Sequence, residues 1–145
     1  MKLYFFILMT FCISFFSCKK ENTPSEPLVI DNSGLAGFDS IQTKSFISDA
    51  HTTTGTVSIY QKDDMVDTLA YVFRNFKTDN GPNLDVWVSE LGIPNANYVN
   101  LGDLKSTNGD FIYKTPKVGN ITAYPNLLIW CADFDVRFGY AVFDL

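Results

Sequence analysis

The sequence predicts an all-β domain, either an antiparallel sandwich or a closed barrel of about seven or eight short strands. Segments rich in β-branched and aromatic residues recur along residues 35–145 at a spacing of roughly ten residues. Clusters of Asn, Asp, Gly and Pro separate these segments, as turns require. Beyond the N-terminal segment, no stretch of helical length repeats its apolar residues with the helical period, so we expect no long helix.

The first expected strands lie in the first half of this domain. Residues 35–47 are weakly apolar and are interpreted as an entry strand and loop. Thr54–Tyr60 is rich in β-branched residues and alternates in polarity, which is typical of a strand. After a turn at Gln61–Asp64, Asp67–Phe76 carries apolar residues on both faces, which indicates a central strand.

The next elements are separated by two turn clusters. Residues 78–83 form a dense turn cluster, after which Leu84–Ser89 and Tyr98–Leu101 are expected as strands. A second cluster contains Asn108-Gly109, and this dipeptide is a strong hairpin cue.

The C-terminal part predicts a final pair of strands. Phe111–Tyr113 is a short strand, and Gly119–Pro125 is a connection with room for one helical turn. Leu127–Trp130 is an apolar run suited to a buried strand, and Cys131–Asp133 is short enough for a tight hairpin connection. On the last strand, alternation predicts one half-buried face formed by Phe134, Val136, Phe138, Tyr140 and Val142.

The N-terminus predicts export and lipidation. An uncharged apolar run, Leu3–Phe16, is about fourteen residues long, which suits a signal peptide and is short for a membrane span. It ends in Ser17-Cys18, which resembles a bacterial lipoprotein signal, so we expect residues 1–17 to be removed and Cys18 to be acylated. Residues 18–34 are polar and interrupted by proline, as in a flexible tether.

Charge and cysteine content narrow the function. Removal of the signal takes away only Lys2, which leaves 10 basic against 16 acidic residues and a net charge of −6. An acidic chain without a basic cluster argues against nucleic acid as a partner. With Cys12 removed and Cys18 acylated, Cys131 has no disulfide partner. The remaining partners to expect are the membrane, through the lipid, and a redox or binding protein.

Four motifs in order resemble a known family. They are His51–Val57, Asn75-Phe76 with Gly81–Ser89, Val99–Lys105 with Asn108-Gly109, and Tyr124 with Ile129–Gly139. Together they are similar to the DM-thirteen domain, a small "electron-transfer" domain that accompanies DOMON domains in Skeletor-type animal cell-surface proteins. The domain also occurs alone in bacterial lipoproteins, and the resemblance covers residues 46–145. It implies a redox role for Cys131, as a bare thiol or as a ligand to a group such as haem. Asn83 stands where the family usually has aspartate.

The residues themselves leave the role of Cys131 open. A reactive thiolate needs nearby cations, yet the neighbours in sequence are apolar or acidic. Arg137 would offset them if the hairpin placed it across from Cys131. Free cysteine is otherwise commonly buried as a small hydrophobe. His51, the single histidine, is an axial ligand type for haem, and its alternative is a surface turn residue.

Other chemistries are not favoured by the sequence. One histidine without a cysteine cluster does not make a zinc site, and no serine elbow or phosphate-binding glycine loop is present. The turns Asp79–Gly81 and Asn108–Asp110 have oxygen ligands of the kind calcium uses, although turns need the same residues. An enzyme is therefore less expected than an accessory module. Two functions stay open, a membrane-anchored redox domain that uses Cys131 and a non-enzymatic binding or scaffold lipoprotein that packs it.

Overall fold

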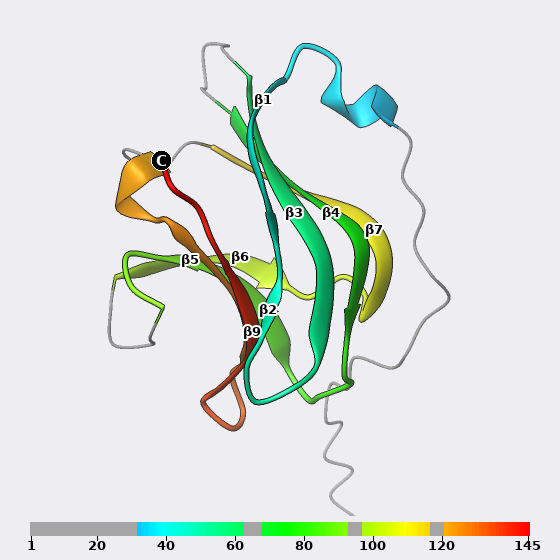
Figure 1. Ribbon diagram of the computed structural model, residues 1–145, viewed down its shortest axis with the longest axis vertical. Coiled ribbons are helices and arrows are strands. Elements are labelled where there is room, and N and C mark those ends of the chain that lie inside the picture. The colour runs from blue at the N-terminus through cyan, green and yellow to red at the C-terminus, as the bar shows by residue number, and fades with distance from the viewer. Residues whose placement is uncertain (1–31, 63–67, 93–96, 117–120) are drawn as a thin grey trace, which may run out of the picture.

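Two antiparallel sheets face one another in the computed structural model, which describes residues 32–62, 68–92, 97–116 and 121–145 (Figure 1). The described residues contain nine strands and two short 3-10 helices, η1 (Asn32–Leu35) and η2 (Ile121–Ala123). The all-β prediction is confirmed in its sandwich form, and the closed barrel is wrong because the two sheets remain separate. No helix among the described residues is long and apolar enough to cross a membrane.

The first sheet has the order β1-β3-β4-β7. Its strands are β1 (Asp39–Ser45), β3 (Thr53–Lys62), β4 (Thr68–Thr78) and β7 (Asn108–Pro116). β4 lies between β3 and β7, so the central strand expected from its two apolar faces is confirmed.

The second sheet has the order β2-β9-β8-β5-β6. Its strands are β2 (Ile47–Ser48), β9 (Val136–Val142), β8 (Asn126–Cys131), β5 (Leu84–Ser89) and β6 (Tyr98–Asp103). β5 and β8 are buried at every position, because each has a neighbour on both sides and apolar cover on both faces. The expected terminal pair of strands is therefore confirmed as β8 and β9, joined by a short hairpin loop.

The hairpin expected at Asn108-Gly109 is wrong. The strands on either side, β6 and β7, belong to different sheets, so the intervening residues cross the sandwich instead of closing a hairpin. Asn108 and Gly109 begin β7, where Gly109 pairs with Phe76 and takes a φ of 110°. The glycine is needed for this backbone conformation, and the local cue misled because it carries no information about which sheet follows.

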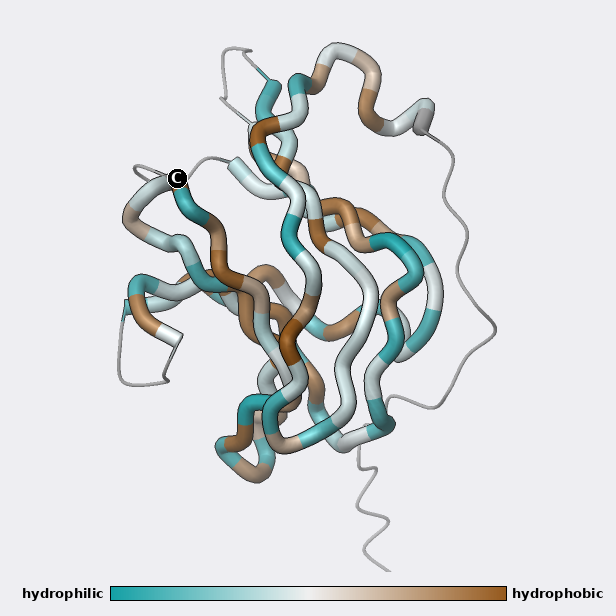
Figure 2. Tube along the Cα trace, viewed as in Figure 1, coloured by the Kyte–Doolittle hydropathy of each residue, from teal (hydrophilic) through white to brown (hydrophobic). Residues whose placement is uncertain are grey.

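Aromatic rings fill the core between the sheets, and Figure 2 shows hydrophobic segments on the strands of both. Phe73 stacks on Phe111 with ring centroids 4.6 Å apart. Phe76 packs edge-on against Phe46 with ring centroids 5.0 Å apart. The side chains of these four phenylalanines are all buried. These contacts join β4 to β7 and to the short segment that follows β1.

Of the face predicted for the last strand, only Val136 and Phe138 face the core. A register irregularity gives β9 one extra residue relative to β8 around Phe138. Beyond this bulge the core-facing residues are Ala141 and Phe143, while Tyr140 is half-buried on the other side and Val142 is 38% exposed. A bulge reverses the alternation because it inserts one residue into a pattern of period two.

Two core tyrosines make the fold sensitive to alkaline pH. Burial raises the pKa of Tyr71 from 10.0 to about 12, and burial likewise raises the pKa of Tyr113. The folded state thus keeps a proton that the unfolded chain loses above about pH 10. The stabilisation is complete below this pH and is lost as the pH rises through the folded pKa.

We expect the free energy of unfolding to fall by about 2 to 3 kcal/mol for Tyr71 alone as the pH rises from about 10 to about 12. Urea unfolding at a series of alkaline pH values measures this loss. Tyr71→Phe should flatten part of the decline, because it removes the titrating phenol from the core. A slope in this variant equal to that of the parent would contradict the prediction.

Candidate functional site

Cys131 is the last residue of β8 and lies inside the sandwich. Its Cα pairs with Leu84 of β5 and Val136 of β9, and its side chain is 0% exposed. The Sγ atom donates a hydrogen bond to the carbonyl oxygen of Pro82 at 3.0 Å. The sequence placed this thiol correctly at the end of a strand next to a turn, and the structure adds that the side chain faces the core.

Two loops meet above Cys131, one before β5 and one between β8 and β9. The backbone N–H of Ala132 donates to the carbonyl of Asn83 at 3.0 Å, and the side-chain amide of Asn83 donates to Asp133 at 2.9 Å. Asn83 and Asp135 both have positive φ, at 51° and 55°. An aspartate at position 83 could not donate this bond and would face a second carboxylate. The side-chain amide of Asn83 therefore joins the two loops.

His51 lies at the same end of the sandwich. Its ring stacks on Phe138 with centroids 3.8 Å apart, and its backbone N–H donates to the carbonyl of Phe138. Nδ1 lies 3.2 Å from Oδ2 of Asp79. A carboxylate only accepts hydrogen bonds, so Nδ1 is the donor in this contact.

A groove opens beside His51, with a volume of about 480 Å³. It is lined mostly by apolar side chains, and its residues are His51, Asn80, Gly81, Pro82, Phe134, Val136 and Phe138. This volume lies within the range of small-molecule pockets, which is about 300 to 1,000 Å³. Pro82 belongs to the groove wall and its carbonyl also accepts the Cys131 thiol, so Cys131 lies directly behind that wall.

The two residues named from the sequence are brought to one end of the fold, but they do not form a shared ligand set. Cys131 is fully buried, and its thiol is committed to a backbone carbonyl. A haem held by both His51 and Cys131 would need the sulfur as an exposed thiolate. The described residues therefore do not fit a haem ligated by this pair.

Phe134 is a groove residue that sequence reasoning missed. Alternation assigned it to the last strand, but it lies in the loop before β9 and is 66% exposed. The loop places its ring in the groove wall. The sequence signal for this residue was a large aromatic side chain within a four-residue connection, where it is exposed. The apparent period-two alternation concealed that signal.

Arg137 does not assist the thiol. It pairs with Trp130, and its Nε donates to Asp49 at 2.7 Å. A second nitrogen donates to the carbonyl of Gly92, and the guanidinium lies 4.0 Å from the ring centroid of Tyr140. The guanidinium therefore lies on the outer face of the second sheet, and the condition under which Arg137 would offset the neighbours of Cys131 is not met.

The carboxylates of the acidic turns contact hydrogen-bond donors of the chain itself. Asp79 contacts His51, while Asp110 accepts from the backbone of Asn75 at 2.7 Å and from Arg74 at 3.0 Å. Within the described parts of the chain, no group of three or more His, Cys, Asp or Glu side chains is placed to hold a metal ion. Both carboxylates are therefore hydrogen-bonded within the fold.

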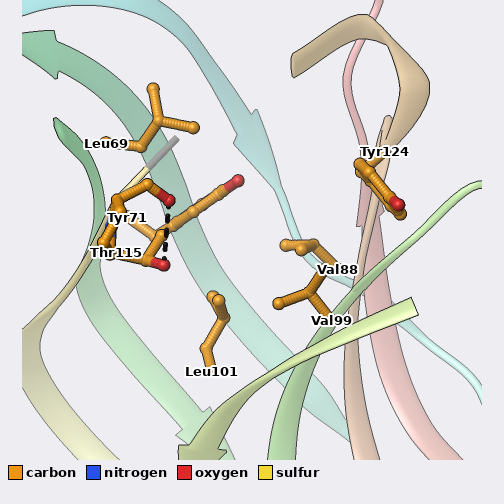
Figure 3. Close-up of a pocket in the computed structure, with 8 residues that line it drawn as sticks. Leu69, Tyr71, Val88, Val99, Leu101, Thr115 and Tyr124 are labelled. Carbon is orange, nitrogen blue, oxygen red and sulfur yellow. Dashed lines mark hydrogen bonds between the residues drawn. The ribbon is translucent and has the colours of Figure 1, made fainter. Parts of the chain in front are cut away.

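A second cavity lies between the sheets at the other end of the sandwich. Figure 3 shows its lining residues, with Leu69, Tyr71 and Thr115 from the first sheet and Val88, Val99, Leu101 and Tyr124 opposite them. The dashed bond runs from Thr115 Oγ1 to the carbonyl of Pro116 at 3.1 Å. The volume is about 20 Å³, which has room for a single water but not for a ligand. The groove beside His51 is thus the better candidate site.

Comparison with known proteins identifies one family model. The model, described as Electron transfer DM13, matches residues 45–143. No curated protein and no solved structure gives a significant match to the chain.

Proposed function

The chain belongs to the DM13 electron-transfer family, and on this premise we propose that it is an electron-transfer accessory domain at the bacterial cell envelope. The partner is a redox protein that docks at the groove lined by His51, Phe134 and Phe138. The match spans residues 45–143 and includes both sides of that groove. Electron transfer as the role is supported by the family, and the docking place is supported by the exposed ring of Phe134 in the groove wall.

The membrane attachment is a proposal from the sequence. The apolar run Leu3–Phe16 and the small residue before Cys18 support signal removal and acylation of that cysteine. Two or more acyl chains would hold the protein stably at a membrane surface. The polar residues up to position 34 would then separate the folded domain from the lipid.

One observation assigns Cys131 a packing role in this proposal, namely its complete burial with the thiol donating to Pro82. A thiol that exchanges electrons by bond formation must meet its partner as an exposed thiolate. Cys131 is instead part of the main core cluster. The non-enzymatic docking module is therefore the better account of this residue.

A second candidate keeps Cys131 as a gated redox thiol. It is favoured by the position of Pro82, which both lines the groove and accepts the thiol hydrogen. Movement of this one residue would expose the sulfur to the groove. The two candidates differ in whether Cys131 reacts in the folded protein.

Alkylation of the full chain in detergent by a maleimide reagent separates the candidates. We expect no labelling of Cys131 until the protein is denatured, because the thiol has no exposed surface. Ala132→Cys in a Cys131→Ala background is the matched control, since Ala132 is exposed in the adjoining loop and should label quickly. Native labelling of Cys131 at a rate near that of the control would favour the gated thiol.

Reduction of ferricyanide by membranes with and without the protein tests the role itself. Cys131→Ala should cost about 1 kcal/mol of stability and retain the protein-dependent rate. Phe134→Asp, at an exposed groove position, should lose that rate without loss of stability. A Cys131→Ala variant that behaves like the deletion would overturn the packing role, and a rate independent of the protein would overturn the electron-transfer proposal.

A further inference from the structure

The outer face of the second sheet carries a row of stacked aromatic rings. Tyr98 of β6 stacks on Trp87 of β5 with ring centroids 4.0 Å apart and planes 10° from parallel. Trp87 in turn stacks on Trp130 of β8 at 5.1 Å and 21°. The three side chains come from three adjacent strands, so the row crosses the sheet from its edge inward.

Exposure is graded along this row. Tyr98 is 47% exposed, whereas Trp87 and Trp130 are 8% and 3% exposed. The row therefore has one end at the surface and one end in the protein. Packing alone would explain two buried tryptophans, but it does not require the exposed tyrosine to lie nearly parallel on the first of them.

A buried carboxylate contacts the middle ring. Asp85 is 8% exposed, and its Oδ2 accepts from the indole nitrogen of Trp87 at 3.4 Å and from the amide of Asn100 at 2.9 Å. An indole nitrogen is only a donor, and a buried charge is costly unless it is hydrogen-bonded. Asp85 thus places a proton acceptor on the one acidic hydrogen of Trp87, and Asn100 holds that acceptor in place.

We propose that Tyr98, Trp87 and Trp130 form a relay for single electrons, with Asp85 as the proton acceptor of Trp87. This inference rests on the proposed electron-transfer function and names residues for it that lie away from the groove. The stacked rings allow a short transfer at each step, and Tyr and Trp are among the side chains that give up a single electron most readily. The relay runs from the surface at Tyr98 to the residue next to Cys131.

A one-electron oxidant, a metal complex acting without bond formation, takes one electron from Tyr98 or from Trp87 and is itself reduced by one electron. When Tyr98 is oxidised, its phenolic proton passes to water and a neutral phenoxyl radical remains. Transfer of one electron from Trp87 to this radical, with return of a proton from water, restores the phenol. When Trp87 has lost the electron, its Nε1 proton passes to Asp85, which leaves a neutral indolyl radical and a carboxylic acid. Return of one electron from a donor brings the proton back to Nε1. Asp85 is thus the proton acceptor of this step, Asn100 is the residue that positions it, and no bond between heavy atoms changes.

Flash photolysis tests the relay in the full chain, with photogenerated tris(bipyridine)ruthenium(III) as the oxidant. Transient absorption distinguishes phenoxyl radicals, indole radical cations and neutral indolyl radicals. We expect Trp130→Phe to retain the indolyl signal and Trp87→Phe to lose it several-fold, because Trp130 is oxidised through Trp87. Equal indolyl yields in these two variants would mean independent oxidation and would overturn the relay.

Two more conservative substitutions keep the test valid if a tryptophan variant fails to fold. Tyr98→Phe retains the stacked ring but removes the oxidisable phenol, so indolyl formation should slow several-fold, while Tyr60→Phe on the other sheet should not change it. Asp85→Asn should prolong the radical cation at the expense of the neutral radical. Tyr98→Phe kinetics equal to those of Tyr60→Phe, or an unchanged radical cation in Asp85→Asn, would contradict the assignment.

The photolysis tests the aromatic relay independently of the ferricyanide test of the proposed function. The ruthenium oxidant needs neither the native partner nor the membrane, so the photolysis reports on the aromatic row alone. Loss of the ferricyanide rate in Phe134→Asp, with normal radical kinetics, would show the docking groove and the relay to be independent. A normal ferricyanide rate in Tyr98→Phe and Trp87→Phe would overturn the relay as part of that function even if the radicals form.

Discussion

Gly55→Ala should lower the free energy of unfolding by about 4 kcal/mol. Gly55 has a φ of +98°, which L side chains rarely adopt. A Cβ there would lie 2.6 Å from the carbonyl oxygen of Asn75, 2.7 Å from the Cα of Phe76 and 2.8 Å from the carbonyl oxygen of Arg74. All three atoms are backbone atoms of β4, so no side-chain rotation relieves the overlap.

A matched control separates backbone strain from steric overlap. Gly102 also has positive φ, at +109°, but a Cβ there would meet nothing within 4 Å. Gly102→Ala should therefore cost only the strain, about 1 to 3 kcal/mol. Urea unfolding of both variants gives the difference. A loss in Gly55→Ala no larger than that in Gly102→Ala would mean that β4 moves away from β3 at little cost.

The close approach at Gly55 has a cause in the pairing of β3 with β4. The register of these strands shifts between Thr54 and Thr56, and β4 has its own irregularity at residues 73–76. Asn75 takes a φ of 47° there, and its backbone N–H donates to Asp110. Asp110 also accepts from Arg74, so β7 secures the bulge on β4 that Gly55 makes possible.

Local patterns predicted the strands well because burial repeats along a strand. The alternation in Thr54–Tyr60 and the two-sided apolar pattern in Asp67–Phe76 each correspond to a strand of the first sheet. Leu84–Ser89 agrees with β5 in its bounds. The order of strands in the two sheets was not predictable in the same way, because it depends on contacts between segments distant in the sequence.

The candidate site was predictable in two of its residues but not in its geometry. His51 and Cys131 were both singled out, and both lie at the same end of the sandwich. Their separation by Pro82 could not be seen from the sequence, since it follows from the meeting of two loops. The bulge in β9 likewise reversed the faces of Tyr140 and Val142, because one extra residue is invisible to a periodic pattern.

The outer aromatic row was the least predictable feature. Trp87 and Trp130 lie on neighbouring strands, and their diagonal contact depends on the register of β5 with β8. From the sequence they were indistinguishable from core residues. The sequence shows which positions carry aromatic rings, but the strand register determines which of these rings are in contact.

Phe76→Ala should lower the free energy of unfolding by about 4 kcal/mol, because a fully buried ring is removed from a rigid cluster. Its ring lies 5.0 Å from Phe46, 5.3 Å from Phe73 and 5.4 Å from Phe111, measured between centroids. The neighbouring rings come from three different segments and cannot all close on the cavity. Thermal or urea unfolding measures the loss.

Phe134→Ala is the matched control, since it removes the same side chain from a position that is 66% exposed. Its stability should stay within about 0.5 kcal/mol of the parent. The effects on function should be reversed. Phe134→Ala should weaken the protein-dependent ferricyanide rate, whereas Phe76→Ala should retain it at temperatures where the protein stays folded. A stability loss in Phe134→Ala comparable to that in Phe76→Ala would mean that its ring serves the fold, and the groove would then lose its claim as a docking surface.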